Sequence, residues 1–428
     1  MLGDNSMLLN YKFENFMSFR NQVEFSMLAP GTKVKKRFPD NYRETKCNYD
    51  VLKTAVIVGE NAGGKSNFVR SLEYFRSFFN HNERVKSYKG LIHSNNSIEH
   101  CPKKCDSCQI FEIEVISENG FIYLYHLEID TWGINQERLS YKNKRSEKYK
   151  LVLDADRKIY NIDCAGDESD CIEKTCHWDA EVGYSIEIPG MDVSMEKTLE
   201  EAMKKQLRIG LFVTKLAILG NEHAIAFSEW MKETLSPETY SVNADLYKSI
   251  RSEEEDLRIL KDSRFINIFK MVDGSILDIE VDEEKPFRKT KVVRQNQDGV
   301  KFKRELGYES SGVSEFFAWA LQIFKVVYEN KVVFADEMDR VLNPVLSDRV
   351  ISLINGKKHS GQFIFTTHNV LHLDLKNYMK EQIYFITKDI ESLESELYSL
   401  ADFPEIRYET TKIYEFYLKG ILGGTVSE

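Results

Sequence analysis

The chain has 428 residues, a net charge of −10 and 42% apolar residues, which predicts one large or two closely joined globular domains rather than disorder. The acidic balance argues against an exterior that coats nucleic acid, although it leaves a local basic groove open. No apolar run is long enough to span a membrane, and seven cysteines without a signal-peptide pattern favour the cytoplasm over a secreted disulfide framework.

The first eighty residues predict strands that lead into a glycine-rich loop. Residues 8–13 and 23–27 alternate apolar and polar side chains, as half-buried strands do. Residues 55–58 form a short apolar run ending in Gly59, and apolar residues then recur near helical spacing over 66–79. A strand, a glycine-rich loop and a helix are the context that a P-loop requires.

The loop itself reads Gly59-Glu60-Asn61-Ala62-Gly63-Gly64-Lys65-Ser66. Glycines let several backbone N–H groups point at a phosphate, and the dipole of the following helix adds to the attraction. We expect Lys65 to reach the β- and γ-phosphates of ATP and Ser66 to bind Mg²⁺. The alternative is a chance match in a surface turn, which the flanking strand and helix argue against.

In the middle of the chain, the spacing of the apolar residues changes twice. Residues 81–108 read as an irregular excursion, and 110–160 as antiparallel strands with a turn at Glu118-Asn119-Gly120. Residues 161–195 are acidic and predict no element. Residues 195–271 show a helical period, interrupted at Ser236-Pro237, without the sustained heptads of a coiled coil.

The last third alternates helices and strands. We expect two strands around a turn at 297–299, a helix over 312–329 and another from Pro344. Apolar runs at 332–335, 363–366 and 383–386 predict three buried strands. Strands that alternate with helices imply parallel crossovers and an α/β core.

Two of these strands end in residues suited to phosphoryl transfer. Asp336 and Glu337 follow the strand at 332–335, so Asp336 would join the Mg²⁺ shell and Glu337 would act as general base on the attacking water. The next strand ends at His368, which would stabilise charge on the γ-phosphate. Alone, the first pattern would equally fit a solvated acidic turn, and the second a surface histidine.

A fourth motif, Glu309-Ser310-Ser311-Gly312-Val313-Ser314-Glu315, opens the helix before Asp336. Serine and glycine at a helix N-terminus form a second phosphate-facing surface. Read alone, Ser310 or Ser311 would be an ordinary N-cap. Its order behind the P-loop makes it similar to an ABC signature.

These motifs occur with others along both ends of the chain. The set is Asn15-Phe16-Met17-Ser18-Phe19, Lys65-Ser66-Asn67, Glu309-Ser310-Ser311-Gly312, Asp336-Glu337-Met338-Asp339 with Leu342-Asn343-Pro344, Gln362-Phe363-Ile364-Phe365-Thr366-Thr367-His368-Asn369, Gln382-Ile383-Tyr384-Phe385, Glu396-Leu397-Tyr398-Ser399-Leu400-Ala401-Asp402-Phe403 and Tyr417-Leu418-Lys419-Gly420. In them the chain resembles the OLD-like, RloA/AbiLi type of ABC ATPase. The resemblance covers residues 7–80 and about 275–424, and the middle only loosely. Asn343 departs from the family, which usually has histidine there.

The resemblance implies an ATP-hydrolysing, SMC-like head that pairs with a second copy. ATP would lie between residues 59–67 of one copy, with Lys65 at the phosphates, and Ser310, Ser311 and Gly312 of the other. It also implies a sensor or regulator of a nuclease or toxin effector in prokaryotic antiphage or abortive-infection defence. Because 60 residues after His368 are too few for a Toprim nuclease, we expect the effector to be a separate protein.

The expected fold class is therefore α/β: an ABC/SMC-type P-loop NTPase head with a mixed sheet core, an antiparallel β subdomain and a helical insertion. We expect a discontinuous ATPase core at 1–80 and 307–428. A β-rich insertion with a cysteine cluster would occupy 81–195, and a helical insertion with a basic hairpin 196–306.

The cysteine cluster has three interpretations. Cys101, Cys105 and Cys108, with Cys176 or with Cys164, Cys171, His177, His93 or His100 as fourth ligand, would form a structural Zn²⁺ site. Unpaired thiols in a variable excursion are the second interpretation. The spacing also matches radical iron–sulfur chemistry, but no barrel pattern surrounds it.

Eight basic residues lie between Lys285 and Arg304, against the single acid Asp298. Nucleic acid or an acidic partner would bind such a segment, so nucleic acid is open as a partner but not required. We favour a solvated hairpin balanced by the preceding acids, Glu280, Asp282, Glu283 and Glu284.

Three other functions compete with a defence ATPase. A RecF/SMC-like DNA-repair ATPase would act directly on DNA, but the absent coiled coil and acidic charge disfavour it. A transporter subunit would have a shorter stretch between Lys65 and Ser311. In a nucleotide-bound scaffold, hydrolysis would be slow.

Overall fold

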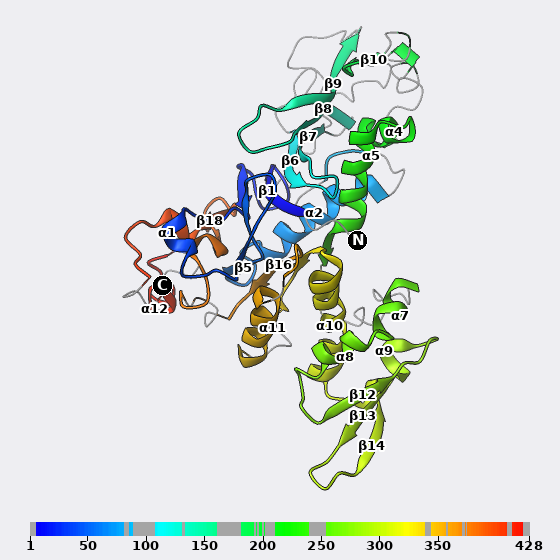
Figure 1. Cartoon of the computed structure of the whole chain (residues 1–428). Helices are drawn as coiled ribbons and strands as arrows, with labels where there is room; N and C mark the ends of the chain where they lie inside the picture. The colour runs from blue at the N-terminus through cyan, green and yellow to red at the C-terminus, as the bar shows by residue number, and fades with distance from the viewer. Residues whose placement is uncertain are drawn as a thin grey trace.

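The computed structural model of the chain describes residues 6–80, 85–88, 108–130, 133–160, 181–191, 194, 197–198, 201, 210–238, 254–338, 344–356, 358–369, 373, 375–408 and 413–422. A six-stranded sheet lies at its centre. A seven-stranded antiparallel sheet and a three-stranded sheet lie at opposite ends of the molecule (Figure 1).

The central sheet has the order β11-β15-β16-β5-β17-β18, in which the first five strands are parallel and β18 is antiparallel. Its strands are β11 (Leu235–Glu238), β15 (Val332–Ala335), β16 (Gln362–Thr367), β5 (Thr54–Gly59), β17 (Ile383–Lys388) and β18 (Ser395–Ser399). Every residue of β15, β16 and β5 is buried. Near-continuous apolar runs of this kind are typical of parallel strands that helices cover on both faces.

Two hydrophobic cores cover the two faces of the central sheet. On one face, helix α2 (Lys65–Asn80) packs between the central sheet and the seven-stranded sheet. The Phe68 ring lies 6.2 Å from Phe334 on the one side and 5.9 Å from Phe13 on the other. On the opposite face, α10 (Ser311–Glu329) and α11 (Pro344–Gly356) bury a second core. The helix that carries the P-loop is therefore fixed from both sides.

The seven-stranded sheet has the order β10-β9-β8-β7-β6-β1-β2 and is antiparallel throughout. Its strands are β1 (Met7–Glu14), β2 (Val23–Ser26), β6 (Gln109–Ile116), β7 (Ile122–Asp130), β8 (Gly133–Lys142), β9 (Lys150–Tyr160) and β10 (Glu181–Glu187). In β6 and β1 buried and partly exposed residues alternate, which places one face on α2 and the other toward solvent.

The remaining described elements are short. They are the strands β3 (Tyr42–Glu44), β4 (Asp50–Leu52), β12 (Ile276–Glu280), β13 (Lys291–Gln295) and β14 (Lys301–Glu305), the helices α1 (Thr32–Lys35), α4 (Phe212–Ile218), α5 (Glu222–Glu229), α7 (Glu254–Leu260), α8 (Ser263–Phe269), α9 (Pro286–Lys289) and α12 (Ile413–Leu418), the π-helix η2 (Trp230–Thr234), and the 3₁₀ helices η3 (Leu306–Tyr308), η6 (Lys380–Gln382) and η7 (Leu400–Asp402). No helix in the described ranges has the length and apolarity needed to cross a membrane.

The predicted α/β class is confirmed, with a mixed central sheet and an antiparallel sheet beside it. Four strands were missed: β10, β11, β12 and β18. Ser236-Pro237 in β11 was interpreted as a break between helices, and β12 completes a sheet with the predicted hairpin. Strand pairing also crosses the expected domain boundaries. β1 pairs with β6, and β11 pairs with β15, so both insertions share sheets with the predicted core.

One buried carboxylate ties the seven-stranded sheet to α4. Glu137 in β8 is fully buried and accepts hydrogen bonds from the backbone N–H groups of Phe212 (2.8 Å) and Val213 (2.7 Å), the first residues of α4. Burial raises the pKa of Glu137 to about 7, and these two hydrogen bonds oppose the rise. The side chain thus caps a helix at the cost of holding a charge in the core.

We expect this group to make stability depend on pH. Its carboxyl ionises near pH 4.5 in the unfolded chain and near 7 in the folded one, so the folded state binds more protons between those values. The free energy of unfolding should therefore fall by about 3 kcal/mol as pH rises from 4.5 to above 7. Glu137→Gln should remove that fall, measured by urea unfolding across the window. Glu118→Gln in the exposed β6–β7 turn is the control, and an unchanged pH slope in Glu137→Gln would contradict the assignment.

Candidate nucleotide-binding site

The ends of three neighbouring strands meet at one edge of the central sheet. β5, β16 and β15 are adjacent and parallel, so their carboxyl ends lie side by side. The P-loop follows β5, His368 follows β16, and Asp336 and Glu337 follow β15. This is the edge at which open α/β sheets bind ligands. Residues far apart in the sequence are brought together here by the strand order alone.

The P-loop is held tightly against the strands beside it, and two of its glycines have no room for a side chain. A Cβ on Gly59 would lie 2.4 Å from the carbonyl oxygen of Ile386 in β17. Gly64 has a φ of +119°, and a Cβ there would lie 2.5 Å from Ser395 Oγ. Any larger residue would therefore push the loop away from β17 and β18.

The ammonium group of Lys65 lies inside the turn of the loop. Its Nζ donates to the carbonyl oxygens of Gly59 (2.8 Å) and Glu60 (2.7 Å), and lies 3.3 Å from His368 Nδ1. The residue is 4% exposed. A buried cation at the N-terminus of α2 adds to the positive end of the helix dipole, so the loop attracts anions.

A hydrogen-bonded chain joins the carboxylates to the P-loop helix. The hydroxyl of Thr366 in β16 donates to Asp336 Oδ1 and accepts from the backbone N–H of Glu337, both at 2.7 Å. Burial raises the pKa of Asp336, and its hydrogen bonds with Ser66 and Thr366 partly offset the rise. Ser66 and Asp336 therefore present two oxygen atoms side by side.

Glu337 turns toward the same site by an unusual backbone conformation. Its φ is +51°, in the left-handed region that non-glycine residues rarely adopt. The hydrogen bond to Thr366 holds it there, and its Oε1 lies 3.9 Å from His368 Nε2. Strain of this kind is retained where the side chain must point at a functional site.

Three small polar side chains, Ser395, Ser18 and Asn67, support the P-loop, and their contacts were not predicted from the sequence. The Ser395 hydroxyl in β18 donates to the Gly63 carbonyl oxygen (2.6 Å) and accepts from the hydroxyl of Ser18 (2.8 Å between the oxygens). Asn67 in α2 also donates to Ser18 Oγ, at 2.8 Å. The Asn15–Phe19 motif therefore reaches the nucleotide loop through Ser18.

The signature segment lies elsewhere. Ser310 caps α10 by accepting from the backbone N–H of Val313 (3.4 Å), Ser310 and Ser311 are exposed, and a Cβ on Gly312 would meet no atom within 4 Å. Directly before it, the Glu309 carboxylate forms an ion pair with Arg294 of β13, with 2.9 Å between Oε2 and Nη2. Within the described residues, no hydrogen bond or ion pair joins Ser310, Ser311 or Gly312 to the P-loop.

The structure thus places the predicted residues in two groups. Lys65, Ser66, Asp336, Glu337 and His368 gather at one edge, with Asn61 and Ala62 exposed on the loop in front of them. Ser310 and Ser311, with the half-buried Gly312, lie apart from them on a separate surface. Asp339, Leu342 and Asn343 lie outside the described residues.

The zinc prediction gains no support. Cys101, Cys105 and Cys176, as well as Cys164, Cys171, His177, His93 and His100, lie outside the described residues. Of the proposed ligands, Cys108 alone is among the described residues. Within the described part of the chain, no group of three histidine, cysteine or acidic residues is placed to hold a metal ion.

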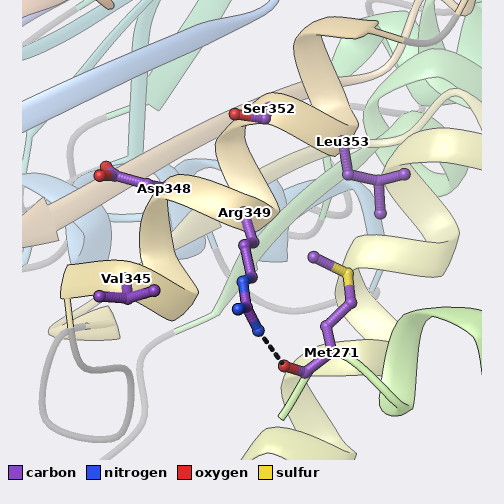
Figure 2. Close-up of a pocket in the computed structure, with 6 residues that line it drawn as sticks. All are labelled: Met271, Val345, Asp348, Arg349, Ser352 and Leu353. Carbon is purple, nitrogen blue, oxygen red and sulfur yellow. Dashed lines mark hydrogen bonds between the residues drawn. The ribbon is translucent and has the colours of Figure 1, made fainter. Parts of the chain in front are cut away.

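A cavity of about 580 Å³ lies between α11 and Met271, which follows α8 (Figure 2). Its lining residues are Met271, Val345, Asp348, Arg349, Ser352 and Leu353. Arg349 reaches across it and donates to the carbonyl oxygen of Met271 at 3.4 Å. No residue predicted to contact nucleotide lines this cavity.

One family model matches part of the chain. A family model described as "AAA domain, putative AbiEii toxin, Type IV TA system" matches residues 219–374. No curated protein sequence resembles the chain closely enough to count as a match.

Among solved structures, the chain is similar to three SMC heads. One is described as the SmcHead bound to the C-winged helix domain of ScpA (14% identity, TM-score 0.45, 92% of this chain and 97% of that one). The second is the SMC head domain from Thermotoga maritima (12% identity, TM-score 0.39, 92% of this chain and 98% of that one). The third is described as an Smc head domain with an extended coiled coil, bound to the C-terminal domain of ScpA derived from Pyrococcus furiosus (13% identity, TM-score 0.40, 92% of this chain and 96% of that one).

The chain's own topology and site define its class. A P-loop follows the central strand of a largely parallel sheet, an acidic pair and a histidine end the two neighbouring strands, and a signature-like helix precedes the acidic pair. These features give the chain the α/β fold of a P-loop nucleotide-binding protein.

Proposed function

We propose that this chain binds ATP with Mg²⁺ and hydrolyses it. The observation that carries the proposal is the convergence of Lys65, the Ser66–Asp336 pair, Glu337 and His368 at the ends of three parallel strands. Hard oxygen atoms from a hydroxyl and a carboxylate are ligands that Mg²⁺ accepts, so Ser66 and Asp336 fit the ion. When bound, Mg²⁺ neutralises charge on the phosphates.

The protein groups then have separate tasks. Lys65 and the N–H groups of the P-loop bind and orient the phosphates. Glu337, held toward the site by its positive φ, accepts a proton from the attacking water. His368, within 3.9 Å of Glu337 and 3.3 Å of Lys65, donates to the charge that develops on the transferred group.

We further propose that two copies complete the site. Ser310 and Ser311 are exposed and Gly312 is half-buried at the N-terminus of a 19-residue helix, and no hydrogen bond between described residues joins them to their own P-loop. A helix N-terminus with serine and glycine favours a phosphate, which a second copy would supply. Head-to-head pairing would place the signature of each copy against the P-loop of the other.

We propose that this ATPase acts in antiphage defence, as a sensor or regulator of a separate nuclease or toxin. Support comes from the motifs shared with OLD-like, RloA/AbiLi-type ATPases and from the matching family model, whose description names a toxin of a toxin–antitoxin system. The model spans the signature helix, Asp336 and His368, so the described site lies partly within it.

Lys65→Ala tests the nucleotide site directly. The buried ammonium provides the only side-chain cation placed inside the described P-loop, so its loss should abolish measurable ATP binding and turnover. Isothermal titration with ATP and Mg²⁺ measures binding, and phosphate release measures turnover. Lys46→Ala, an exposed lysine far from the loop, is the matched control. Retained ATP affinity in Lys65→Ala would disprove the nucleotide site.

A further inference from the structure

We propose that the β13–β14 hairpin, together with α9, binds the phosphate backbone of nucleic acid. The segment comprises residues 285–305 and lies at the end of the molecule opposite the seven-stranded sheet (Figure 1). The proposal goes beyond ATP hydrolysis and does not depend on it.

The eight basic side chains of this segment fall into two groups: two that form ion pairs within the protein, and six that are exposed to a binding partner. Arg294 is buried and bonds to Glu309 and Asp273, and Lys303 forms an ion pair with Glu280. The other six are exposed and form no ion pair with any described residue: Lys285, Arg288, Lys289, Lys291, Lys301 and Arg304. Lys291 lies in register between Glu280 and Glu305. Of the other five, Lys285, Arg288 and Lys289 lie at or in α9, and Lys301 and Arg304 lie in β14.

The preceding acidic residues form few ion pairs with these cations, which favours a bound partner over the balanced hairpin preferred in the sequence analysis. Of the four, only Glu280 pairs with a hairpin lysine. Glu283 pairs with Lys261 instead, and Asp282 accepts from the backbone N–H of Lys285. The hairpin and α9 therefore carry an excess of positive charge on a chain whose net charge is −10.

The shape of the hairpin suits a nucleic-acid groove better than a protein surface. β14 is the outer strand of its sheet and is exposed from Lys301 to Arg304, with Phe302 43% exposed among the cations. A two-stranded ribbon fits the major groove of duplex DNA, and an exposed aromatic ring can stack on unpaired bases. An acidic protein would meet few apolar contacts here, since only Val300 and Phe302 are large exposed apolar residues within the hairpin.

The same sheet holds the signature segment. Arg294 in β13 forms an ion pair with Glu309, the residue directly before Ser310. The hydroxyl of Ser314 donates to the carbonyl oxygen of Leu306, which directly follows β14, at 2.9 Å. A nucleic acid on the hairpin would therefore lie beside the signature rather than beside the P-loop of the same copy.

The test compares two triple variants of the full chain with equal change in charge. The hairpin variant is Lys289→Ala, Lys301→Ala and Arg304→Ala. The control is Lys46→Ala, Lys144→Ala and Lys148→Ala, all exposed on other parts of the molecule. Fluorescence anisotropy measures binding of a labelled duplex of ~30 base pairs, and of the same single strand, at salt concentrations between ~50 and ~200 mM. ATP affinity and turnover without DNA, measured in parallel, should be equal in both variants and separate this proposal from the proposed ATPase function.

We expect the wild type and control to bind DNA with steep salt dependence. The hairpin variant should bind more weakly, and its slope of log affinity against log salt should be smaller by about 2.7, since each lost phosphate contact removes about 0.9. Equal binding by the hairpin variant and the wild type would overturn the proposal, as would a wild type that binds neither DNA at the lowest salt. Binding of polyglutamate but not DNA, lost in the hairpin variant, would also overturn it and assign the surface to an acidic protein.

Discussion

Glu337→Gln should lower ATP turnover by roughly 100- to 10,000-fold while leaving ATP binding intact, because a positioned general base contributes that much to proton transfer. The amide keeps the shape of the side chain and cannot accept the proton of the attacking water. The backbone N–H of Glu337, which donates to Thr366, is unaffected, so the turn should keep its geometry. Single-turnover phosphate release with saturating ATP measures the chemical step.

The control is Glu391→Gln, an exposed residue in the turn between β17 and β18 that changes the same charge at the same edge of the sheet. It should leave turnover unchanged. Wild-type turnover in Glu337→Gln would remove Glu337 as the base and favour a scaffold in which hydrolysis is slow or irrelevant. Loss of ATP binding as well would show that the substitution disturbs the P-loop.

The central sheet could be predicted from the sequence because its strands carry strong local signals. Residues 332–335, 363–366 and 383–386 are apolar runs bounded by polar residues, and each becomes a buried strand. Parallel strands covered on both faces need such runs, so their burial is encoded locally. The strand order is not local, but alternation with helices was sufficient to predict parallel crossovers.

The missed strand β11 shows where local signals mislead. Ser236-Pro237 was interpreted as an interruption between helices, since proline lacks the N–H that a helix interior needs. In the structure Pro237 lies in β11, which is the outermost strand of the central sheet. Proline is tolerated at an edge because one side of that strand needs no partner. Only the pairing with β15, almost a hundred positions along the chain, identifies the strand.

The candidate site likewise contains residues that local patterns predict and residues that only the folded structure identifies. Lys65, Asp336, Glu337 and His368 could be predicted because each follows a buried strand at recognisable spacing. Ser395 could not, because its contacts with Ser18 and Gly63 join positions more than 300 residues apart. A serine in a β-hairpin carries no signal of its own. Thr366 was inside a predicted strand, but its bond to Asp336 requires the register of β15 and β16.

Mixing two inactive variants should restore activity if the site is shared between copies. Lys65→Ala disables the P-loop half of a site, and Ser311→Glu places a negative charge on the exposed signature surface, opposite the phosphates. A glutamate in the first turn of α10 also favours the helix, so folding should be preserved. In a mixed pair, the intact P-loop of one copy faces the intact signature of the other.

Random reassortment at equal amounts makes half of the pairs mixed, and each mixed pair holds one intact site of two, so turnover should recover to about a quarter of wild type. The control mixture is Lys65→Ala with Glu337→Gln. Both changes lie in the same half of the site, since Lys65 and Glu337 flank His368 within one copy, and no mixed pair then contains an intact site. Recovery in the first mixture and none in the second can arise only when the P-loop and signature of one site come from different copies. If neither mixture recovers, while each variant still reassorts, the exposed position of Ser311 has another purpose and the pairing proposal is wrong.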